Sequence, residues 1–265
     1  MRILVAPDKF KGSLGAAKVA EHIAAGLREE LPGAEITELP VADGGEGTAG
    51  VICAAAGGVW HTCAAHDALG NTIAARYCTV ENGAIAVMEM SEAAGLWRLP
   101  ERLRNPETAS SFGVGEMLLD AARRGAQRII IGLGGSATND GGSGMARALG
   151  FCFLDAQGGE LGCSASELVR LHQIEVPAEL RLPSITAAVD VQNPLLGEHG
   201  ATRSYGPQKG ADAEQVHRLE RALARLADVV AREFGTDARG GRQRCSGWAW
   251  VRVASVLPGV NPLGL

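Results

Sequence analysis

Aromatic residues are scarce in this sequence, since phenylalanine, tryptophan and tyrosine together make up 4% of its 265 residues. Glycine, by contrast, occurs 36 times. This combination favours an α/β protein with many tight turns over a β-sandwich, because glycine suits turns and sandwich strands are rich in aromatic residues. The length is enough for one or two domains with a substantial hydrophobic core.

The chain also lacks an excess of basic residues and a long apolar run. Its formal net charge is −5, which argues against a surface that binds nucleic acid. No apolar run approaches the ~20 residues that a membrane span requires, so no membrane partner is expected. The first residues, MRILVAPDKF, turn polar after the sixth position and predict a strand rather than a signal peptide.

Cysteine shows neither a metal-binding nor a disulfide pattern. The six cysteines form no C-x-x-C pair and have no regular spacing. We therefore expect reduced, mostly buried thiols in a cytoplasmic protein, at Cys53, Cys63, Cys78, Cys152, Cys163 and Cys245.

The most concentrated glycines lie in the stretch from Arg128 to Gly150. The run Arg128–Leu133 is β-branched and predicts a buried strand, and Ser143–Leu149 predicts the start of a helix. Between them lies GGSATNDGG, with four glycines in nine residues. A strand, a glycine-rich turn and a helix suit phosphate, because free amides and the positive helix end point at one place.

Two interpretations of GGSATNDGG are open. It is neither the phosphate loop G-x-x-x-x-G-K-S/T, because the lysine is missing, nor G-x-G-x-x-G. The glycines alone are equally typical of a tight turn with an Asn/Asp cap. The hydroxyls of Ser136 and Thr138, the Asn139 amide and the Asp140 carboxylate favour ligand binding, with Asp140 as a candidate metal ligand.

The chain begins with a strand–helix–strand pattern. Arg2–Ala6 and Glu35–Val41 predict strands, and the residues between them predict a helix that Ser13 caps and that runs to about Glu30. This order implies a parallel crossover, and ligands of such sheets bind beyond the carboxyl ends of the strands.

Polar loops follow both of these strands. Lys9 and Lys11 in the first loop suit phosphate oxygens, although short-loop lysines are more often solvated. Asp43 and Glu46 in the second loop suit Mg²⁺. The alternative for this pair is a turn closed by Asp43 and a favourable helix-dipole position for Glu46.

Most other elements are predicted from periodicity and turn signals. Asn82-Gly83 between two β-like runs predicts a hairpin. Glu89 falls near the end of the following strand, where a solvated side chain is commoner than one that lines a cleft. The predicted strands are 61–63, 72–80, 84–90 and 151–154, the last leading into a hairpin turn, and the predicted helices are 48–56, 113–124 and 212–234.

A further apolar strand, Ser184–Val191, carries Asp190 near its end. An aspartate at that place suits a general base or a metal ligand, and its alternative role is to close a turn. The polar loop that follows contains Arg203 and Lys209, two cations that suit a carboxylate.

Five segments together resemble the bacterial glycerate kinases. They are APDKFKGSL (6–14), PVADGGEGT (40–48), GLGGSATNDGGSGMARALG (132–150), VDVQNPLLGEHGA (189–201) and YGPQKGA (205–211). The resemblance covers the chain to about Asp237. It implies phosphorylation of D-glycerate by ATP with Mg²⁺ in organic acid metabolism, with 2-phosphoglycerate as the usual product and 3-phosphoglycerate as the alternative. It also implies a Rossmann- or flavodoxin-like parallel-sheet domain, a second mixed α/β domain and an active site between them.

These expectations combine into a hypothesis for the site. A kinase without a covalent intermediate must hold Mg²⁺–ATP and position an alcohol oxygen. Asp190 is the predicted base, Lys11 is the second predicted catalytic residue, and Arg203 and Lys209 are predicted to bind substrate. The predicted Mg²⁺ ligands are Asp43, Glu46 and Asp140. The predicted phosphate- and nucleotide-binding residues are Gly134, Gly135, Ser136, Ala137, Thr138, Asn139, Lys9 and Ser13.

Residues 238–265 depart from the family pattern. They contain four arginines and no acidic residue, and they do not match the continuation that the family carries. We expect an altered reading frame or a truncation near Arg239, which leaves the Rossmann-like sheet incomplete. The expected layout is residues 1–65 as the first part of that domain, 66–237 as the second domain with shared cleft elements, and 238–265 as an atypical tail.

Two functional alternatives stay open. The first is a kinase of another small hydroxy acid, because the sequence does not define the acceptor pocket. The second is an inactive chain that binds a phosphorylated ligand or only associates with itself, because a missing sheet edge exposes apolar surface. The expected partners are the small molecules D-glycerate and ATP, and the expected alternative to a monomer is a homo-oligomer.

Overall fold

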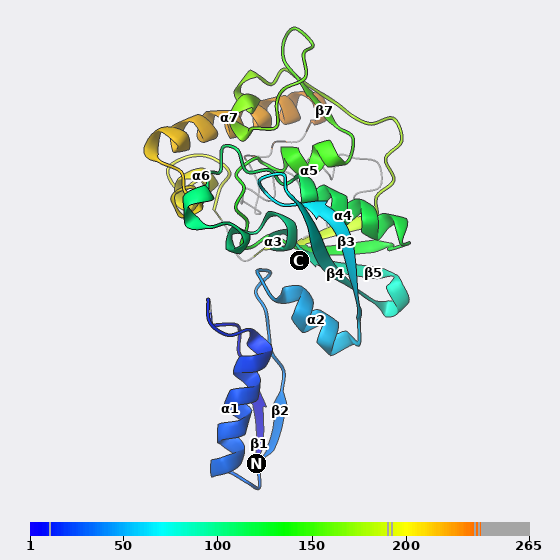
Figure 1. The fold of residues 1–265 in the computed structure, drawn as a ribbon, viewed down its shortest axis with the longest axis vertical. Helices are drawn as coiled ribbons and strands as arrows, with labels where there is room; N and C mark the ends of the chain where they lie inside the picture. The colour runs from blue at the N-terminus through cyan, green and yellow to red at the C-terminus, as the bar shows by residue number, and fades with distance from the viewer. Residues whose placement is uncertain (11, 190, 192, 236, 238, 240–265) are drawn as a thin grey trace.

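The N-terminal residues of the computed structural model form a small unit that extends like an arm from the rest of the molecule (Figure 1). The structure describes residues 1–10, 12–189, 191, 193–235, 237 and 239. Strands β1 (Arg2–Val5) and β2 (Glu35–Glu38) pair in parallel, and helix α1 (Ala16–Glu30) connects them. The predicted strand–helix–strand unit is confirmed.

The predicted N-cap of this helix is wrong. Phe10 and Leu14 form an isolated antiparallel bridge, and the N–H of Ser13 donates to the Phe10 carbonyl at 2.9 Å. This tight turn delays the start of α1 to Ala16, with Gly15 as the N-cap and no side-chain cap bond. Ser13 is therefore left exposed instead of capping the helix.

A five-stranded mixed sheet forms the centre of the larger part of the molecule, in the order β3-β4-β5-β6-β9. Strands β3, β4 and β5 are antiparallel neighbours, whereas β5, β6 and β9 run parallel. The short 3-10 turn η1 (Glu81–Gly83) joins β4 to β5, which confirms the predicted hairpin and the mixed α/β fold class. The bounds of the five strands are Val59–His66, Thr72–Val80, Ile85–Glu89, Arg128–Gly132 and Ser184–Ala188.

Helices cover both faces of this sheet, because apolar side chains alternate between the two faces of its strands. In β5, Val87 packs in one buried cluster with Ala49 and Cys53. Its neighbours Ala86 and Met88 belong to the main core on the other face. The helices on the two sides are α2 (Thr48–Ala56) for the first cluster, and α3 (Met90–Ala94) and α4 (Phe112–Arg123) for the second.

The predicted domain boundary near residue 65 falls inside this sheet. Strand β3 pairs with β4 over its whole length, from Val59 opposite Thr79 to His66 opposite Thr72. Helix α2 packs against β4 and β5. These hydrogen bonds and contacts place residues 48–66 with the larger part of the molecule, and the arm consists of β1, α1 and β2.

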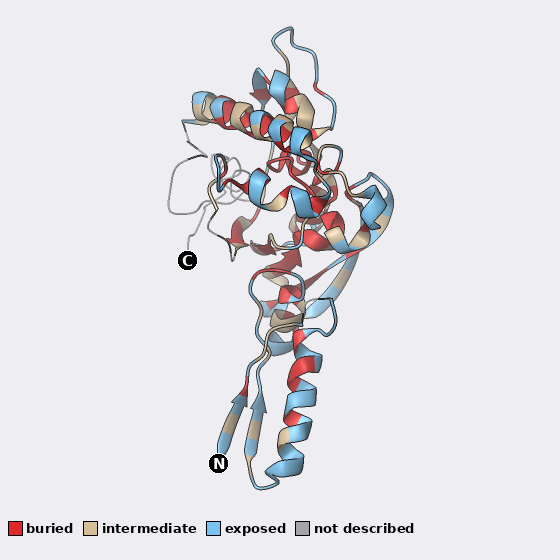
Figure 2. Ribbon diagram, turned by 90° about the vertical axis from the view of Figure 1, so that its left-hand side faces the viewer, coloured by how far each residue is buried: buried red, intermediate tan, exposed pale blue. Residues whose placement is uncertain are grey.

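The buried residues concentrate in the larger part of the molecule (Figure 2). The remaining elements also belong to this part. Strand β7 (Cys152–Leu154) pairs with β8 (Gln173–Glu175). The predicted hairpin turn after β7 is also present, because Leu154 and Glu160 form an antiparallel bridge and the N–H of Leu161 donates to the carbonyl of Phe153 at 2.8 Å. The long helix α7 packs on η4 and β8. The other bounds are α5 (Ser143–Ala148), α6 (Ala201–Tyr205), α7 (Ala213–Phe234), η2 (Leu96–Arg98), η3 (Glu101–Leu103), η4 (Ala165–Arg170) and η5 (Pro207–Lys209).

Two expectations from composition concern cysteines and membrane spans. Cys53, Cys63 and Cys78 are buried, Cys152 is half-buried and Cys163 is exposed. Cys245 lies outside the described residues. No helix in the described part of the chain is long and apolar enough to cross a membrane.

Helix α7 begins with a capping box that carries a stability prediction. The Asp212 carboxylate accepts the N–H of Gln215 at 2.8 Å, and the Gln215 side chain accepts the N–H of Asp212 at 2.9 Å. We expect Asp212→Ala to lower the free energy of unfolding by about 1 kcal/mol, because a helix amide loses its acceptor. Urea unfolding measures this loss. Asp212→Asn keeps a capping oxygen and should lose much less, so equal losses in the two variants would contradict the capping role.

Candidate active site

The carboxyl ends of β6 and β9 meet the loop that follows β2. A Cβ atom on Gly44 would lie 2.9 Å from the carbonyl carbon of Ala188, and one on Gly134 would lie 2.6 Å from the Cα of Gly45. The N–H of Gly134 donates to the carbonyl of Gly44 at 3.3 Å. Only glycine allows backbones to approach so closely. The two glycine-rich segments of the sequence are therefore in direct contact.

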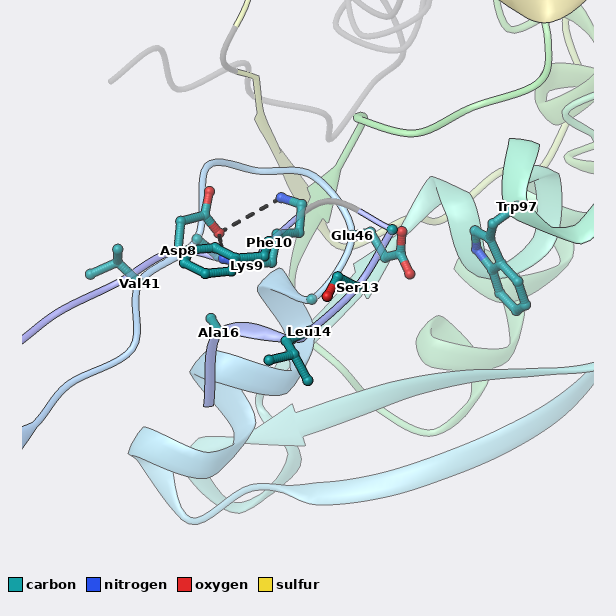
Figure 3. A pocket seen from close by; sticks show the side chains of 13 residues that line it. Asp8, Lys9, Phe10, Ser13, Leu14, Ala16, Val41, Glu46 and Trp97 are labelled. Carbon is teal, nitrogen blue, oxygen red and sulfur yellow. Dashed lines mark hydrogen bonds and ion pairs between the residues drawn. The ribbon is translucent and has the colours of Figure 1, made fainter. Parts of the chain in front are cut away.

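A pocket of about 290 Å³ opens beside this contact (Figure 3). One wall comes from the loop between β1 and α1, a second comes from the loop between β2 and α2, and Trp97 stands across from them. The lining residues are Asp8, Lys9, Phe10, Gly12, Ser13, Leu14, Gly15, Ala16, Val41, Ala42, Glu46, Gly47 and Trp97.

An ion pair between Lys9 and Asp43 lies at the pocket. The Lys9 ammonium donates to Asp43 Oδ1 at 3.0 Å, and the N–H of Gly45 donates to the same oxygen at 2.9 Å. Burial opposes both charges, but these contacts outweigh it, so the pKa of Lys9 is raised and the pKa of Asp43 is lowered. Both groups are therefore charged at neutral pH, and the Lys9 ammonium also lies 3.7 Å from Asp8 Oδ1.

Two of the three predicted metal-binding carboxylates lie at this place. Glu46 lines the pocket, and Asp43 contacts Lys9. Mg²⁺ usually takes one or two carboxylates, completed by substrate phosphates and water, so this pair fits the ion chemically. Within the ranges that the structure describes, no three His, Cys, Asp or Glu side chains gather closely enough to hold a metal ion.

The third predicted metal ligand, Asp140, has a different environment. Asp140 is 2% exposed, and its carboxylate accepts four hydrogen bonds, from the amide and hydroxyl of Ser111 and from the amides of Gly142 and Gly144. Of these donors Gly144 lies in the first turn of α5, where the amides of Ser143 and Met145 also have acceptors, the carbonyl of Asp140 and Ser111 Oγ. The expectation that this helix end faces a phosphate is therefore wrong, because Asp140 already occupies it.

Other amides of the glycine-rich loop are available to a ligand. The amides of Gly134 and Ala137 donate to the carbonyls of Gly44 and Ala94. Between them, the amides of Gly135 and Ser136 have no hydrogen-bond partner among the described residues. Gly135 is exposed and has φ +74°, a backbone conformation that favours glycine. The predicted phosphate-binding stretch thus contains two adjacent amides that can serve this purpose.

Lys209 lies beneath this loop rather than in the pocket. Its side chain is buried, and its ammonium donates to the carbonyl of Thr138 at 2.6 Å and to Ser136 Oγ at 3.1 Å. Burial lowers the pKa of Lys209 to about 8, against the opposing effect of the nearby Asp140 charge. This geometry differs from the prediction that Lys209 holds a substrate carboxylate.

The remaining predicted residues are less informative. Asn139 is buried, and its amide donates to Thr202 Oγ1 at 2.9 Å, so the side chain links the loop to α6. Arg203 is exposed on α6. Asp190 and Lys11, the two predicted catalytic residues, lie outside the described residues.

Glu89 is buried, so the solvated side chain that the sequence favoured at this position is wrong. It is 6% exposed and accepts the amides of Ala49 at 2.8 Å and Gly47 at 3.0 Å. Burial raises the pKa of Glu89, although these two amides partly oppose the shift. The carboxylate fixes the start of α2, directly after Glu46, to the end of β5. The available signal was its place as the last residue of an otherwise apolar strand.

Comparisons with known proteins agree with this arrangement. The chain is 41% identical to a glycerate 2-kinase of Escherichia coli (strain K12) over 242 residues, which cover 90% of this chain and 64% of that protein. It is 41% identical to a glycerate kinase of Bacillus subtilis (strain 168) over 255 residues, which cover 94% of this chain and 67% of that protein. The chain thus spans about two thirds of the length of these relatives.

A solved structure and a family model give the same result. The crystal structure of a "putative glycerate kinase 2" from Salmonella typhimurium LT2 matches with a TM-score of 0.84 and 38% identity, covering 99% of this chain and 71% of that one. The model of the glycerate kinase family matches residues 3–249. The chain therefore belongs to the glycerate kinase family.

Proposed function

We propose that this chain carries the active site of a kinase that transfers the γ-phosphoryl group of ATP to D-glycerate. The observation that carries the proposal is the contact between Gly45 and Gly134. It brings the charged Lys9 and Asp43 next to a loop with two available amides. A cation and a carboxylate that line the pocket, and free amides on the loop that contacts its wall, are groups that phosphoryl transfer uses. The names of the relatives support glycerate as the acceptor.

The amides of Gly135 and Ser136 bind phosphate oxygens of ATP in this proposal. They lie in a turn and need no rearrangement to point at an anion, which favours binding. Lys9 supplies a positive charge from the opposite wall. Asp43 and Glu46 hold Mg²⁺, which neutralises phosphate charge when it is bound.

Glycerate binds in the pocket with its carboxylate near a cation. Arg203 retains its predicted role as a further carboxylate ligand, and Lys11 retains its predicted catalytic role. Asp190 is the proposed base that accepts the proton of the attacking hydroxyl. With the 2-hydroxyl as the nucleophile, the product is 2-phosphoglycerate.

Turnover of the purified chain tests this function. We expect phosphorylation of D-glycerate with ATP and Mg²⁺ at about 1–100 per second, a rate ordinary for kinases. NMR spectroscopy of the product separates 2-phosphoglycerate from 3-phosphoglycerate. L-Glycerate, glycolate and lactate serve as competing acceptors. Faster turnover of one of these would change the substrate, and a folded, monodisperse sample with no turnover on any acceptor would contradict the proposal.

The variant Lys9→Met tests the proposed role of Lys9 in phosphate binding. Loss of this cation should lower kcat/KM for D-glycerate phosphorylation by about 100-fold, because a single charged donor in such a site supplies that order of stabilisation. Lys18→Met is the control, since Lys18 is exposed on α1 and pairs only with Glu21 among the described residues. Equal activity of the two variants would exclude Lys9 from phosphate binding.

A further inference from the structure

The side chain of Trp97 occupies an unusual position for a tryptophan. It belongs to the short turn η2, lines the pocket and is 53% exposed. In Figure 3 its indole stands across the pocket from Lys9 and Phe10, with Glu46 between the two sides. A large apolar ring gains little from burial at such a place.

Three contacts nevertheless fix this indole. Its Nε1–H donates to the carbonyl of Ser91 at 3.1 Å. The guanidinium of Arg98 lies over the ring, 4.5 Å from its centroid, and Arg98 also donates to Glu92 at 3.3 Å. A Cβ atom on Gly95 would lie 2.7 Å from Nε1, so only glycine leaves room for the ring to fold back over its own turn. The ring is thus held in one orientation before any ligand arrives.

The orientation leaves an aromatic surface for a ligand. Arg98 covers the ring from one side, and the exposed part of the ring lines the pocket. A flat ring stacked on an indole gains more than the area it buries, whereas glycerate has no ring to stack. The chemistry of this wall therefore fits the base of a nucleotide.

The position of Trp97 next to the phosphate-binding amides supports the same ligand. The residue before it, Leu96, donates its N–H to the carbonyl of Gly135 at 2.9 Å. Gly95 and Ser136 form an isolated antiparallel bridge. The turn that carries the indole and the loop that carries the free amides are therefore hydrogen-bonded to each other.

We propose that Trp97 stacks on the adenine base of the ATP whose phosphates bind at Gly135 and Ser136. This inference rests on the proposed kinase function. It makes Trp97 and the Arg98 behind it the determinants of nucleotide affinity, and it leaves the wall with Lys9 and Ser13 for the transferred phosphate and the acceptor.

Calorimetric binding of two ligands tests the inference in the presence of Mg²⁺. ATP has a base and tripolyphosphate has none. Trp97→Ala should raise the Kd for ATP about 10-fold or more, because base–aromatic stacking is worth that much, and should leave the Kd for tripolyphosphate unchanged. Trp97→Phe keeps a ring and should recover most of the ATP affinity.

Trp60→Ala is the matched control. Trp60 is also a half-exposed tryptophan with an arginine over its ring, since Arg76 lies 5.4 Å from the ring centroid, but it belongs to β3 and does not line the pocket. Its replacement should change neither Kd. Equal ATP affinity of Trp97→Ala and the unmodified chain, or equal weakening of ATP and tripolyphosphate, would overturn the inference.

The binding measurements and the turnover assay together distinguish a failure of this inference from a failure of the proposed function. If the chain phosphorylates D-glycerate while Trp97→Ala binds ATP normally, the kinase function stands and the stacking role fails. If the chain binds ATP through Trp97 but phosphorylates none of the acceptors, the stacking role stands and the glycerate kinase proposal fails. A folded chain that binds neither ATP nor tripolyphosphate would overturn both.

Discussion

Asp140→Ala is expected to lower the free energy of unfolding by about 3–5 kcal/mol, among the largest losses that one substitution produces. The carboxylate is almost fully buried and accepts four hydrogen bonds. Alanine leaves the amides of Ser111, Gly142 and Gly144 without this acceptor in a site that water does not reach. The loss therefore exceeds that of an ordinary turn residue. Urea unfolding of the two proteins measures it.

Asp155→Ala provides a matched control for this prediction. Asp155 Oδ1 accepts the amides of Gln157 at 3.0 Å and Gly159 at 2.8 Å, so it bonds two and four residues ahead as Asp140 does. These bonds are exposed, and water replaces the lost acceptor there. We expect its replacement to cost about 1 kcal/mol. Equal losses at the two positions would show that the Asp140 network is not closed to solvent.

Two measurements on Asp140→Ala, its stability and the Mg²⁺ concentration that it needs for turnover, separate a structural role of Asp140 from a metal-binding one. Removal of a metal ligand raises the Mg²⁺ concentration needed for turnover and does not require a loss of stability. Removal of a buried hydrogen-bond acceptor lowers stability with or without the ion. The geometry around Asp140 favours the second result, because its oxygens are already bonded to the chain.

The sequence predicted elements where the determining signals are local. Thr48–Ala56 is helical with the predicted bounds, and the Asn82-Gly83 turn lies between β4 and β5 as expected. Apolar periodicity and turn chemistry act within a few residues, so one sequence reveals them. Ser13 shows the limit, since its suitability as a cap was overridden by the bridge between Phe10 and Leu14.

The environment of each site residue depends on partners that are distant in the sequence. The sequence alone does not show which distant residues come into contact. Lys209 contacts Ser136 across 73 positions, and Glu89 contacts Gly47 across 42. The glycine-rich loop itself was recognisable from its composition. Which of its groups stay free for a ligand and which are bonded to the rest of the chain was not recognisable, because Ser111 and Lys209 decide that division.

Lys209→Met is expected to lower kcat/KM for glycerate phosphorylation by about 100-fold, although Lys209 does not reach the pocket. Its ammonium holds the carbonyl of Thr138 and the hydroxyl of Ser136 on the loop that presents the free amides. A small displacement of binding groups costs activity of that order. The loss should be present with every acceptor and should include a higher KM for ATP. A kinetic change confined to glycerate would instead support direct contact with the substrate carboxylate.

The pH dependence of stability gives an independent test of the same residue. Burial lowers the pKa of Lys209 to about 8, whereas an unfolded lysine keeps its proton up to a pH of about 10.4. Between these values the unfolded chain binds more protons than the folded one, so the free energy of unfolding rises with pH. Relative to Lys209→Met, the unmodified chain should gain as much as about 3 kcal/mol from pH 8 to 10.4, and should lose this gain as the pH falls. The difference between the two proteins cancels the groups that they share, and Lys18→Met tests whether loss of any positive charge has the same effect. Parallel stability curves for the unmodified chain and Lys209→Met would show that the amine does not titrate in a buried site.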